Sequence, residues 1–278
     1  MTAARQRPGP TGLAELGRRR ARRELVSSGT LWWVRVGSVL LALSVWELVG
    51  RSVNPLFLPP PSRVVAGMVE SFGPELSPAI GSSLGTFLLG YGLSALIGIP
   101  VGLAMGRSRL VEHSLDTFVY ALYVVPTVAF VPLLVLWLGF GLTAKIIIVI
   151  SVAVFPIIIN CFVGAKEVSV SLLEVGRASM AGRRKIFLSI VMPATLPFIL
   201  AGLRLSIARA LTGMVVAELF TAIGGLGGLL MIYSNQLRTD LAFGPVIVLM
   251  AMGIGFTALL RFIETRVVAW KETERAQK

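Results

Sequence analysis

The chain has 278 residues, of which 55% are hydrophobic and 14% are charged, and its formal net charge is +12 at pH 7. Because a soluble domain carries about 25% charged residues, this sequence offers too little polar surface to enclose a soluble core of this size. The composition therefore disfavours a soluble enzyme, a disordered chain and a fibrous protein, and it indicates an integral membrane protein.

The first 30 residues form a polar segment with seven arginines directly before the first apolar stretch. Basic flanks of this kind mark the cytoplasmic side of a membrane span, so the positive charge indicates topology and not nucleic-acid binding. The segment is too long and too charged for a signal-peptide flank, and no small-x-small cleavage site follows cleanly. We expect residues 1–30 to be a cytoplasmic tail and the first span to be retained.

Six apolar stretches follow, each close to or above the roughly 20 residues that cross a bilayer as a helix. Alternation with period 2 is absent, and backbone groups in lipid need internal partners, so each stretch is predicted to be helical. The expected spans are 31–50, 76–106, 117–144, 146–165, 196–223 and 241–260. The predicted fold is therefore an all-α, polytopic bundle of six transmembrane helices.

The basic residues support this count and give an orientation. With both termini placed in the cytoplasm, 19 lysines and arginines lie in inside segments and four lie in outside segments. Five spans would put one of the terminal basic clusters outside, against the positive-inside rule. We expect a transmembrane domain over residues 31–268 and a cytoplasmic C-terminal tail over residues 269–278.

The outside segment after the first span contains three consecutive prolines followed by Ser62, which is predicted to cap a short helix over residues 63–72. One face of this helix is apolar, so it is expected to lie at the membrane interface. The residues on that face are Val64, Val65, Met68 and Phe72.

Glycines in the second expected span recur at a spacing that lets helices approach closely. They are Gly81, Gly85, Gly98, Gly102 and Gly106. The spacing fits a seam between subunits or bundles, and it fits ordinary packing within one chain equally well. Prolines at three positions can kink the third and fourth spans. These are Pro126, Pro132 and Pro156.

Signals of catalysis or metal binding are scarce. His113 is the single histidine and Cys161 the single cysteine, and neither a phosphate loop nor an H-E-x-x-H motif occurs. Residues 253–258 match the letters of a dinucleotide fingerprint, but they lie in an expected span with no preceding strand. We expect no catalytic residue, no metal, no cofactor and no nucleotide hydrolysis by this chain alone.

Three charged residues interrupt the fifth expected span, namely Arg204, Arg209 and Glu218. A charge within a membrane span is costly and usually faces a partner or water. Two interpretations stay open at this point: a satisfied contact between helices, or a role in a translocation pathway or a subunit contact.

The loop over residues 166–195 is the second unusual feature. A serine precedes a short amphipathic helix, a turn is expected near Gly182, and a second helix returns to the membrane. These signals predict a compact helical knob on the cytoplasmic side, suited to docking into a groove on a partner. The alternative is an amphipathic loop that lies on the membrane surface without a partner.

This loop resembles the EAA loop of binding-protein-dependent ABC importer permeases. That motif has E-A-A, a glycine four residues after the second alanine, and a hydrophobic-x-Pro ending, and here Glu174 and Pro193 stand at the family separation. Val175 and Gly176 replace the two alanines and Met180 stands at the glycine position, with Gly182 two residues later. The resemblance therefore implies a turn that is displaced or differently built.

Further segments resemble the branch that handles nitrate, sulfonates and taurine, so that the resemblance covers nearly everything after about residue 30. They are 58–62 (LPPPS), 125–126 (VP), 136–141 (LWLGFG), 193–197 (PATLP), 202–204 (GLR), 217–219 (AEL), 224–227 (GGLG) and 238–240 (RTD).

The resemblance implies a type I ABC importer permease subunit in a bacterial inner membrane. Such subunits pair, commonly as homodimers, with two cytoplasmic ATPase subunits and an extracytoplasmic solute-binding protein, and the cargo would be a small anion such as a sulfonate, taurine or nitrate. The coupling contact with the ATPase would involve Leu173, Glu174, Val175, Gly176, Arg177, Ala178, Met180 and Gly182.

Two other classes remain as alternatives. A secondary transporter would work without an ATPase and would often show internal repeats, which this sequence lacks. An intramembrane enzyme would need clustered polar residues near the membrane surface.

Overall fold

The computed structural model describes residues 28–221 and 224–267, with side chains from Trp32 onward. Nearly all of the two expected tails, 1–30 and 269–278, therefore lies outside the described residues. Every regular element within the described ranges is helical, as the sequence predicts. The chain divides into two compact units, residues 1–63 and 64–278, which are considered separately.

The first unit contains helix α2 (Ser28–Ser52), which matches the first expected span. Its side chains are almost all exposed, and Trp32 packs edge-on against Trp33 with ring centroids 4.8 Å apart. Near its end, Glu47 accepts hydrogen bonds from the backbone N–H (3.0 Å) and the hydroxyl (2.8 Å) of Ser62. Helix α3 begins at Pro61, so the expected capping role of Ser62 is wrong: its hydroxyl is engaged by the carboxylate.

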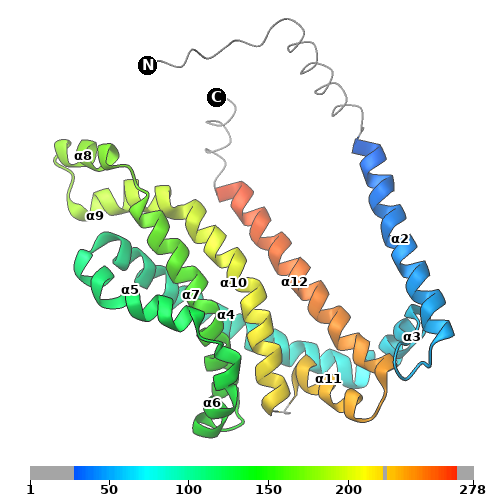
Figure 1. Ribbon diagram of the computed structural model, residues 1–278. Coiled ribbons are helices and arrows are strands. Elements are labelled where there is room, and N and C mark those ends of the chain that lie inside the picture. The colour runs from blue at the N-terminus through cyan, green and yellow to red at the C-terminus, as the bar shows by residue number, and fades with distance from the viewer. Residues whose placement is uncertain (1–27, 222–223, 268–278) are drawn as a thin grey trace, which may run out of the picture. The chain divides into compact units, whose positions relative to one another are not determined.

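The second unit is a succession of helices with short connections (Figure 1). Their bounds are α3 (Pro61–Ser71), which starts at the unit boundary, η1 (Phe72–Leu76), α4 (Ser77–Arg107), α5 (Arg109–Val124), η2 (Thr127–Phe130), α6 (Val131–Leu138), α7 (Leu142–Lys166), α8 (Val170–Ala178), α9 (Arg183–Ile186), η3 (Phe187–Val191), α10 (Met192–Thr221), α11 (Gly225–Asn235) and α12 (Thr239–Val267).

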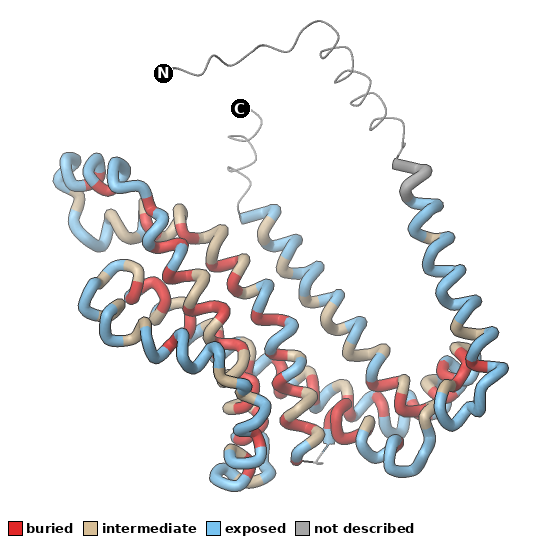
Figure 2. Tube along the Cα trace, in the orientation of Figure 1, coloured by how far each residue is buried: buried red, intermediate tan, exposed pale blue. Residues whose placement is uncertain are grey.

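Helices α4, α7 and α10 form the centre of this unit, where most of the buried residues gather (Figure 2). Phe87 of α4, Val149 of α7 and Met214 of α10 are completely buried against one another. The hydroxyl of Tyr91 donates a hydrogen bond of 2.9 Å to the backbone carbonyl of Leu203, which joins α4 to α10. Helix α12 is buried only near its start, and most of its apolar surface faces outward.

The third expected span, 117–144, is not one continuous helix. It consists of α5 and of η2 with α6, which meet at an angle of 84° around Pro126. Proline lacks an N–H group and keeps the preceding residue extended, and Val125 has φ −62° and ψ 130°. The next helix begins at Leu142 after a turn at Gly139 (φ 78°), so the boundary expected between 144 and 146 is also wrong.

Five of the described helical segments are long and apolar enough to cross a membrane, and the bent pair brings the number to six. The six-span count is thus consistent with the structure when α5 and α6 are taken as one broken span. Pro132 lies in the first turn of α6, where a missing N–H costs nothing, and Pro156 lies inside α7.

The glycines of α4 separate into two groups. A Cβ atom added at Gly98 would lie 3.0 Å from the side chain of Ile157, and one added at Gly102 would lie 2.6 Å from Cβ of Cys161. Gly106 is equally close to α7, whereas Gly81 and Gly85 have open space around them. Within the chain, the first group therefore allows the close packing of α4 on α7, and the second is not needed for it.

We expect the substitution Gly102→Ala to lower the free energy of unfolding by about 1–3 kcal/mol, because the new methyl group would press on the α7 backbone. The matched substitution Gly85→Ala should be neutral, or stabilising by up to about 1 kcal/mol through helix propensity. Thermal unfolding of both purified variants in detergent tests this. Equal melting temperatures for the two variants would contradict the close packing.

Helix α3 divides its apolar face between packing and exposure. Val64 is buried and Met68 packs against the cluster that contains Leu76 and Leu241, whereas Val65 and Phe72, the first residue of η1, are exposed. Gly67 lies directly against the side chain of Leu241 at the start of α12. The expected interfacial position of this helix remains a prediction.

Candidate functional site

The loop over residues 166–195 folds as the sequence predicts, into a short helix followed by a return. Helices α8 and α9 lie at one end of α7 and α10, and α6 and α11 lie at the other end (Figure 1). Leu173 and Gly176 are buried beneath α8, and Leu173 packs in a cluster with Val168 and Val191. A Cβ atom on Gly176 would lie 2.8 Å from the side chain of Ile190, so glycine lets α8 lie close to the returning segment.

The turn after α8 is at Met180 and not at Gly182. Met180 has φ 53°, its N–H donates to the carbonyl of Arg177 (2.9 Å), and the N–H of Ala181 donates to the carbonyl of Gly176 (3.3 Å). This pair of bonds is the Schellman motif, in which glycine usually takes the left-handed position. Gly182 instead has extended backbone and precedes α9. The left-handed residue of the turn is therefore Met180, which stands at the glycine position of the EAA motif and adopts the conformation that glycine usually takes.

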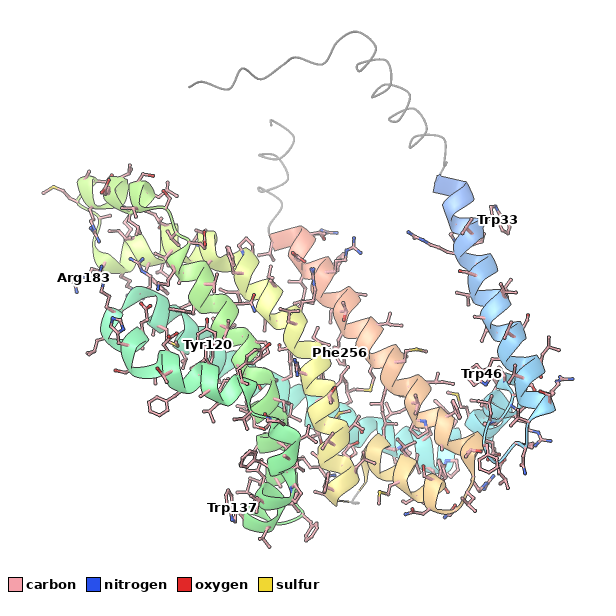
Figure 3. The ribbon with its side chains drawn as sticks, viewed as in Figure 1. Trp33, Trp46, Tyr120, Trp137, Arg183 and Phe256 are labelled. Atoms are coloured by element: carbon pink, nitrogen blue, oxygen red, sulfur yellow. The ribbon has the colours of Figure 1, made fainter. Side chains whose placement is uncertain are left out.

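The outward side of α8 is accessible and mixed in chemistry. Glu174 and Arg177 are exposed, and Val175 (64%) and Met180 (94%) are exposed apolar residues. Ala178 is also exposed. Figure 3 shows Arg183, at the start of α9, projecting at the same end of the chain. The knob thus has a buried side that fixes its shape and an exposed side that a partner could contact.

Backbone strain at Met180 leads to a testable expectation. A side chain in the left-handed region costs about 1–2 kcal/mol, and glycine avoids this cost but orders a more flexible residue. Met180→Gly should therefore be tolerated, whereas β-branched Met180→Val should loosen the turn. Tryptic cleavage after Arg183 and Arg184 in membranes measures this: the valine variant should be cut faster than the parent and the glycine variant no faster. Faster cleavage of the glycine variant would contradict the role of the turn.

Glu218 lies in a completely buried site where α4, α10 and α11 meet. Its carboxylate accepts hydrogen bonds from the hydroxyl of Ser83 (2.7 and 2.9 Å) and from the N–H of Gly227 (2.9 Å). The N–H of Leu226 donates to the Ser83 hydroxyl oxygen (2.7 Å). Carboxylate and hydroxyl together satisfy two of the free N–H groups at the start of α11, where the helix dipole also favours a negative charge.

The glycines before and within α11 make this site possible. Gly224 (φ 65°) and Gly225 (φ 81°) both adopt conformations that favour glycine, and a Cβ atom on Gly225 would collide with the Glu218 carboxylate. A Cβ atom on Gly227 would lie 2.7 Å from the carbonyl oxygen of Val215. Lys145 of α7, itself buried, adds a favourable charge interaction with Glu218. The Glu218 carboxylate therefore connects α10 to α4 and α11. This is a satisfied contact between helices, the first of the two interpretations given for it from the sequence.

Arg204 lies on a different face of α10 and forms an ion pair with Glu264 of α12. Both side chains are partly exposed, at 41% and 33%. The pair links α10 to α12, and a role of Arg204 in the pathway or in a subunit contact stays a prediction.

Arg209 differs from both. It lines a cavity of about 300 Å³ together with Ser151 of α7, Thr212 of α10 and residues 123–128 around the break between α5 and η2. Among the residues that the structure describes, Arg209 forms no ion pair and no hydrogen bond. The structure thus separates the three intramembrane charges, two paired and one facing a cavity.

No group of three or more histidine, cysteine, aspartate or glutamate side chains in the described ranges is placed to hold a metal ion. Cys161 is buried in the core between α4, α7 and α10, and His113 is exposed on α5.

Sequence reasoning missed the partners of these charged residues. Ser83 and the N–H groups of α11 hold Glu218, and Ser151 and Thr212 share the cavity with Arg209. The glycine-rich run at 224–228 and the isolated hydroxyls within apolar spans were the available signals, but neither indicates which helix lies opposite.

An all-helical chain with five or six helices long and apolar enough to cross a membrane belongs to the class of polytopic helical membrane proteins. Residues 96–269 match the family described as "Binding-protein-dependent transport system inner membrane component". The chain belongs to this family, and it is therefore a multi-pass inner-membrane permease of the ABC importer type.

Two relatives agree with this assignment. The chain is 30% identical over 243 residues to the taurine transport system permease protein TauC of Escherichia coli (strain K12), covering 84% of this chain and 88% of the relative. It is 31% identical over 234 residues to the putative aliphatic sulfonates transport permease protein SsuC of Bacillus subtilis (strain 168), covering 83% and 85%.

Among solved structures, an inward-facing form of the MetNI methionine ABC transporter is similar, with a TM-score of 0.55 and 18% identity over 69% of this chain and 93% of that chain. This likeness concerns the fold alone.

Proposed function

We propose that this chain is the permease subunit of an ATP-driven importer, that it pairs with a second copy, and that α8 couples it to cytoplasmic ATPase subunits. The observation that carries the proposal is the helical knob formed by α8. Its inner side is held by the buried residues Leu173 and Gly176. Its outer side exposes Glu174, Val175 and Met180. An apolar surface with an exposed charge, held on a rigid base, suits docking into a groove.

The same end of the chain is proposed to be cytoplasmic, with both termini inside. Positive charges favour that side, and Arg183, Arg184 and Lys185 all lie on α9. Trp137 lies near the end of α6, far from Arg183 (Figure 3), as expected for an aromatic residue at the outer interface.

The proposed cargo is a small anion such as a sulfonate, taurine or nitrate, delivered by an extracytoplasmic solute-binding protein. Support comes from the two relatives named for taurine and aliphatic sulfonates, and from the sequence motifs shared with that branch.

The mechanism we propose has two states. When ATP closes the ATPase subunits, they pull the two knobs of the paired permeases together and the pathway opens outward. Hydrolysis releases the knobs, and the pathway opens inward. Because α8 is joined to α7 on one side and to α10 through α9 and η3 on the other, its displacement reaches the central helices directly.

Uptake measured in inside-out and right-side-out membrane vesicles tests the proposal. Vesicles that contain the permease, its co-purified ATPase and its binding protein should accumulate labelled taurine, ethanesulfonate or nitrate only when ATP is present on the ATPase side. A secondary transporter would accumulate the anion with an ion gradient and without the ATPase. That second outcome would overturn the proposal.

A further inference from the structure

We infer that the cavity beside the break in the third span is an anion-binding site on the permease itself, with the Arg209 guanidinium as its recognition group. This inference rests on the proposed function, because it assigns a contact point within the pathway to the anion that is transported.

The position of the cavity favours a transport role. Ser151, Val152 and Phe155 lie in the middle of α7, and Arg209 and Thr212 lie well inside α10, so the cavity is at mid-span depth. Irregular backbone within a membrane span is tolerated where it lines a cavity, and the 84° bend between α5 and α6 supplies such backbone here. Binding sites near the bilayer centre beside broken helices are common in transporters.

The chemistry of the lining favours an anion. An arginine stays charged at any physiological pH and offers five N–H donors in a planar arrangement that matches carboxylates, phosphates and similar oxyanions. In this chain those donors have no internal acceptor within the described residues, whereas Arg204 on the same helix is neutralised by Glu264. Arg209 is exposed in the single chain, and the cavity beside it has a mixed lining of valines, Phe155 and hydroxyl-bearing residues. An unneutralised arginine in a span is costly, so its presence beside such a cavity is typical of a functional site.

The neighbouring hydroxyls of Ser151 and Thr212 have their protons engaged, so Arg209 is the group in the cavity with free donors for an anion. The hydroxyls of Ser151 and Thr212 donate to carbonyls of their own helices, Ile148 (2.7 Å) and Ala208 (2.9 Å). None of the described residues that line the cavity carries a carboxylate. Its volume of about 300 Å³ is at the low end for small-molecule sites, which suits an anion of a few heavy atoms.

Charge-selective labelling tests the site without measuring transport. In full-length permease co-assembled with its ATPase, Cys161→Ser removes the native thiol and Thr212→Cys places a single thiol in the cavity. The thiol is then labelled with 2-sulfonatoethyl methanethiosulfonate, itself a sulfonate anion, or with the trimethylammonium reagent of similar size. The anion-to-cation rate ratio should fall at least tenfold when Arg209→Gln is added, because a positive cavity concentrates anions.

A thiol placed elsewhere is the matched control. Ser77→Cys, at the exposed start of α4, should show a rate ratio that Arg209→Gln does not change. If Arg209→Gln leaves the ratio at Thr212→Cys unchanged as well, the anion site is overturned. The arginine would then pair with the second copy or extend to the membrane surface.

Uptake measurements then separate this inference from the proposed function. ATP-driven uptake of the transported anion should fall at least tenfold in Arg209→Gln, with partial recovery in Arg209→Lys and unchanged co-purification of the ATPase. Arg261→Gln removes the same charge from α12, outside the cavity, and should stay within twofold of the parent. ATP-driven uptake that persists in Arg209→Gln overturns the site and leaves the importer intact, whereas absence of ATP-driven uptake in the parent overturns the importer.

Discussion

Replacing Glu218 by alanine should lower the free energy of unfolding by about 3–5 kcal/mol, the loss expected when one partner of a buried charged network is removed. The N–H of Gly227 would lose its acceptor and the hydroxyl of Ser83 would lose the group to which it donates. Lys145 would also remain buried without the negative charge that favours it. A large drop in melting temperature and in the amount of folded protein is therefore expected.

The substitution Glu218→Gln should cost less, about 1–2 kcal/mol. Glutamine keeps an oxygen that can accept from Ser83 or Gly227, but it loses the charge that the start of α11 favours. The order parent, glutamine, alanine in melting temperature is the signature of a carboxylate that caps α11. Glu70→Ala is a suitable control, since Glu70 is exposed and its pairing with Arg238, at 3.7 Å, should contribute little.

Hydrogen exchange locates the effect as well as its size. The N–H groups of Leu226 and Gly227 should exchange much faster in Glu218→Ala, while those in the middle of α7 change little. If both variants left assembly, melting temperature and uptake unchanged, neither bracing nor a pathway role would survive for Glu218.

The parts of this fold that follow from sequence are those set by local hydrophobicity and local turn chemistry. The lengths of α2, α4, α7, α10 and α12 follow from the width of a bilayer, and the α8 knob follows from its amphipathic spacing. The break at Pro126 had a local signal, because proline removes a donor and restricts Val125. The sequence around Pro126 did not predict the angle of 84° between α5 and α6, because the size of a bend at proline depends on how the neighbouring helices pack.

The candidate sites show the opposite balance. That Glu218 and Arg209 are unusual is evident from their apolar surroundings, but that one is fully paired and the other faces a cavity depends on α4, α7 and α11, which are distant in sequence. The glycines make the same point: identical spacing in α4 serves tight packing on α7 at Gly98 and Gly102, whereas no described residue packs closely at Gly81 and Gly85.

Deleting three residues at the end of α8, Arg177 to Ser179, should abolish ATP-driven uptake while the subunit stays in the membrane. The deletion removes the last turn of α8 and the carbonyl of Arg177 that anchors the Met180 turn, so the exposed side of the knob would lose its shape. The central helices α4, α7 and α10 do not depend on this turn, since their buried core lies within the spans. Uptake and membrane content of the same vesicles measure the two effects.

A single exposed substitution distinguishes docking from folding at this site. Val175 is 64% exposed on α8, so Val175→Asp should leave the melting temperature of the isolated subunit unchanged but should reduce the retention of the ATPase on purified permease at least tenfold. Leu237→Asp is the matched control, because Leu237 is a similarly exposed residue (66%) in a turn at the opposite end. If both variants retain the ATPase equally, and the deletion variant still imports with ATP, then α8 is not the coupling element and the knob is an ordinary surface loop.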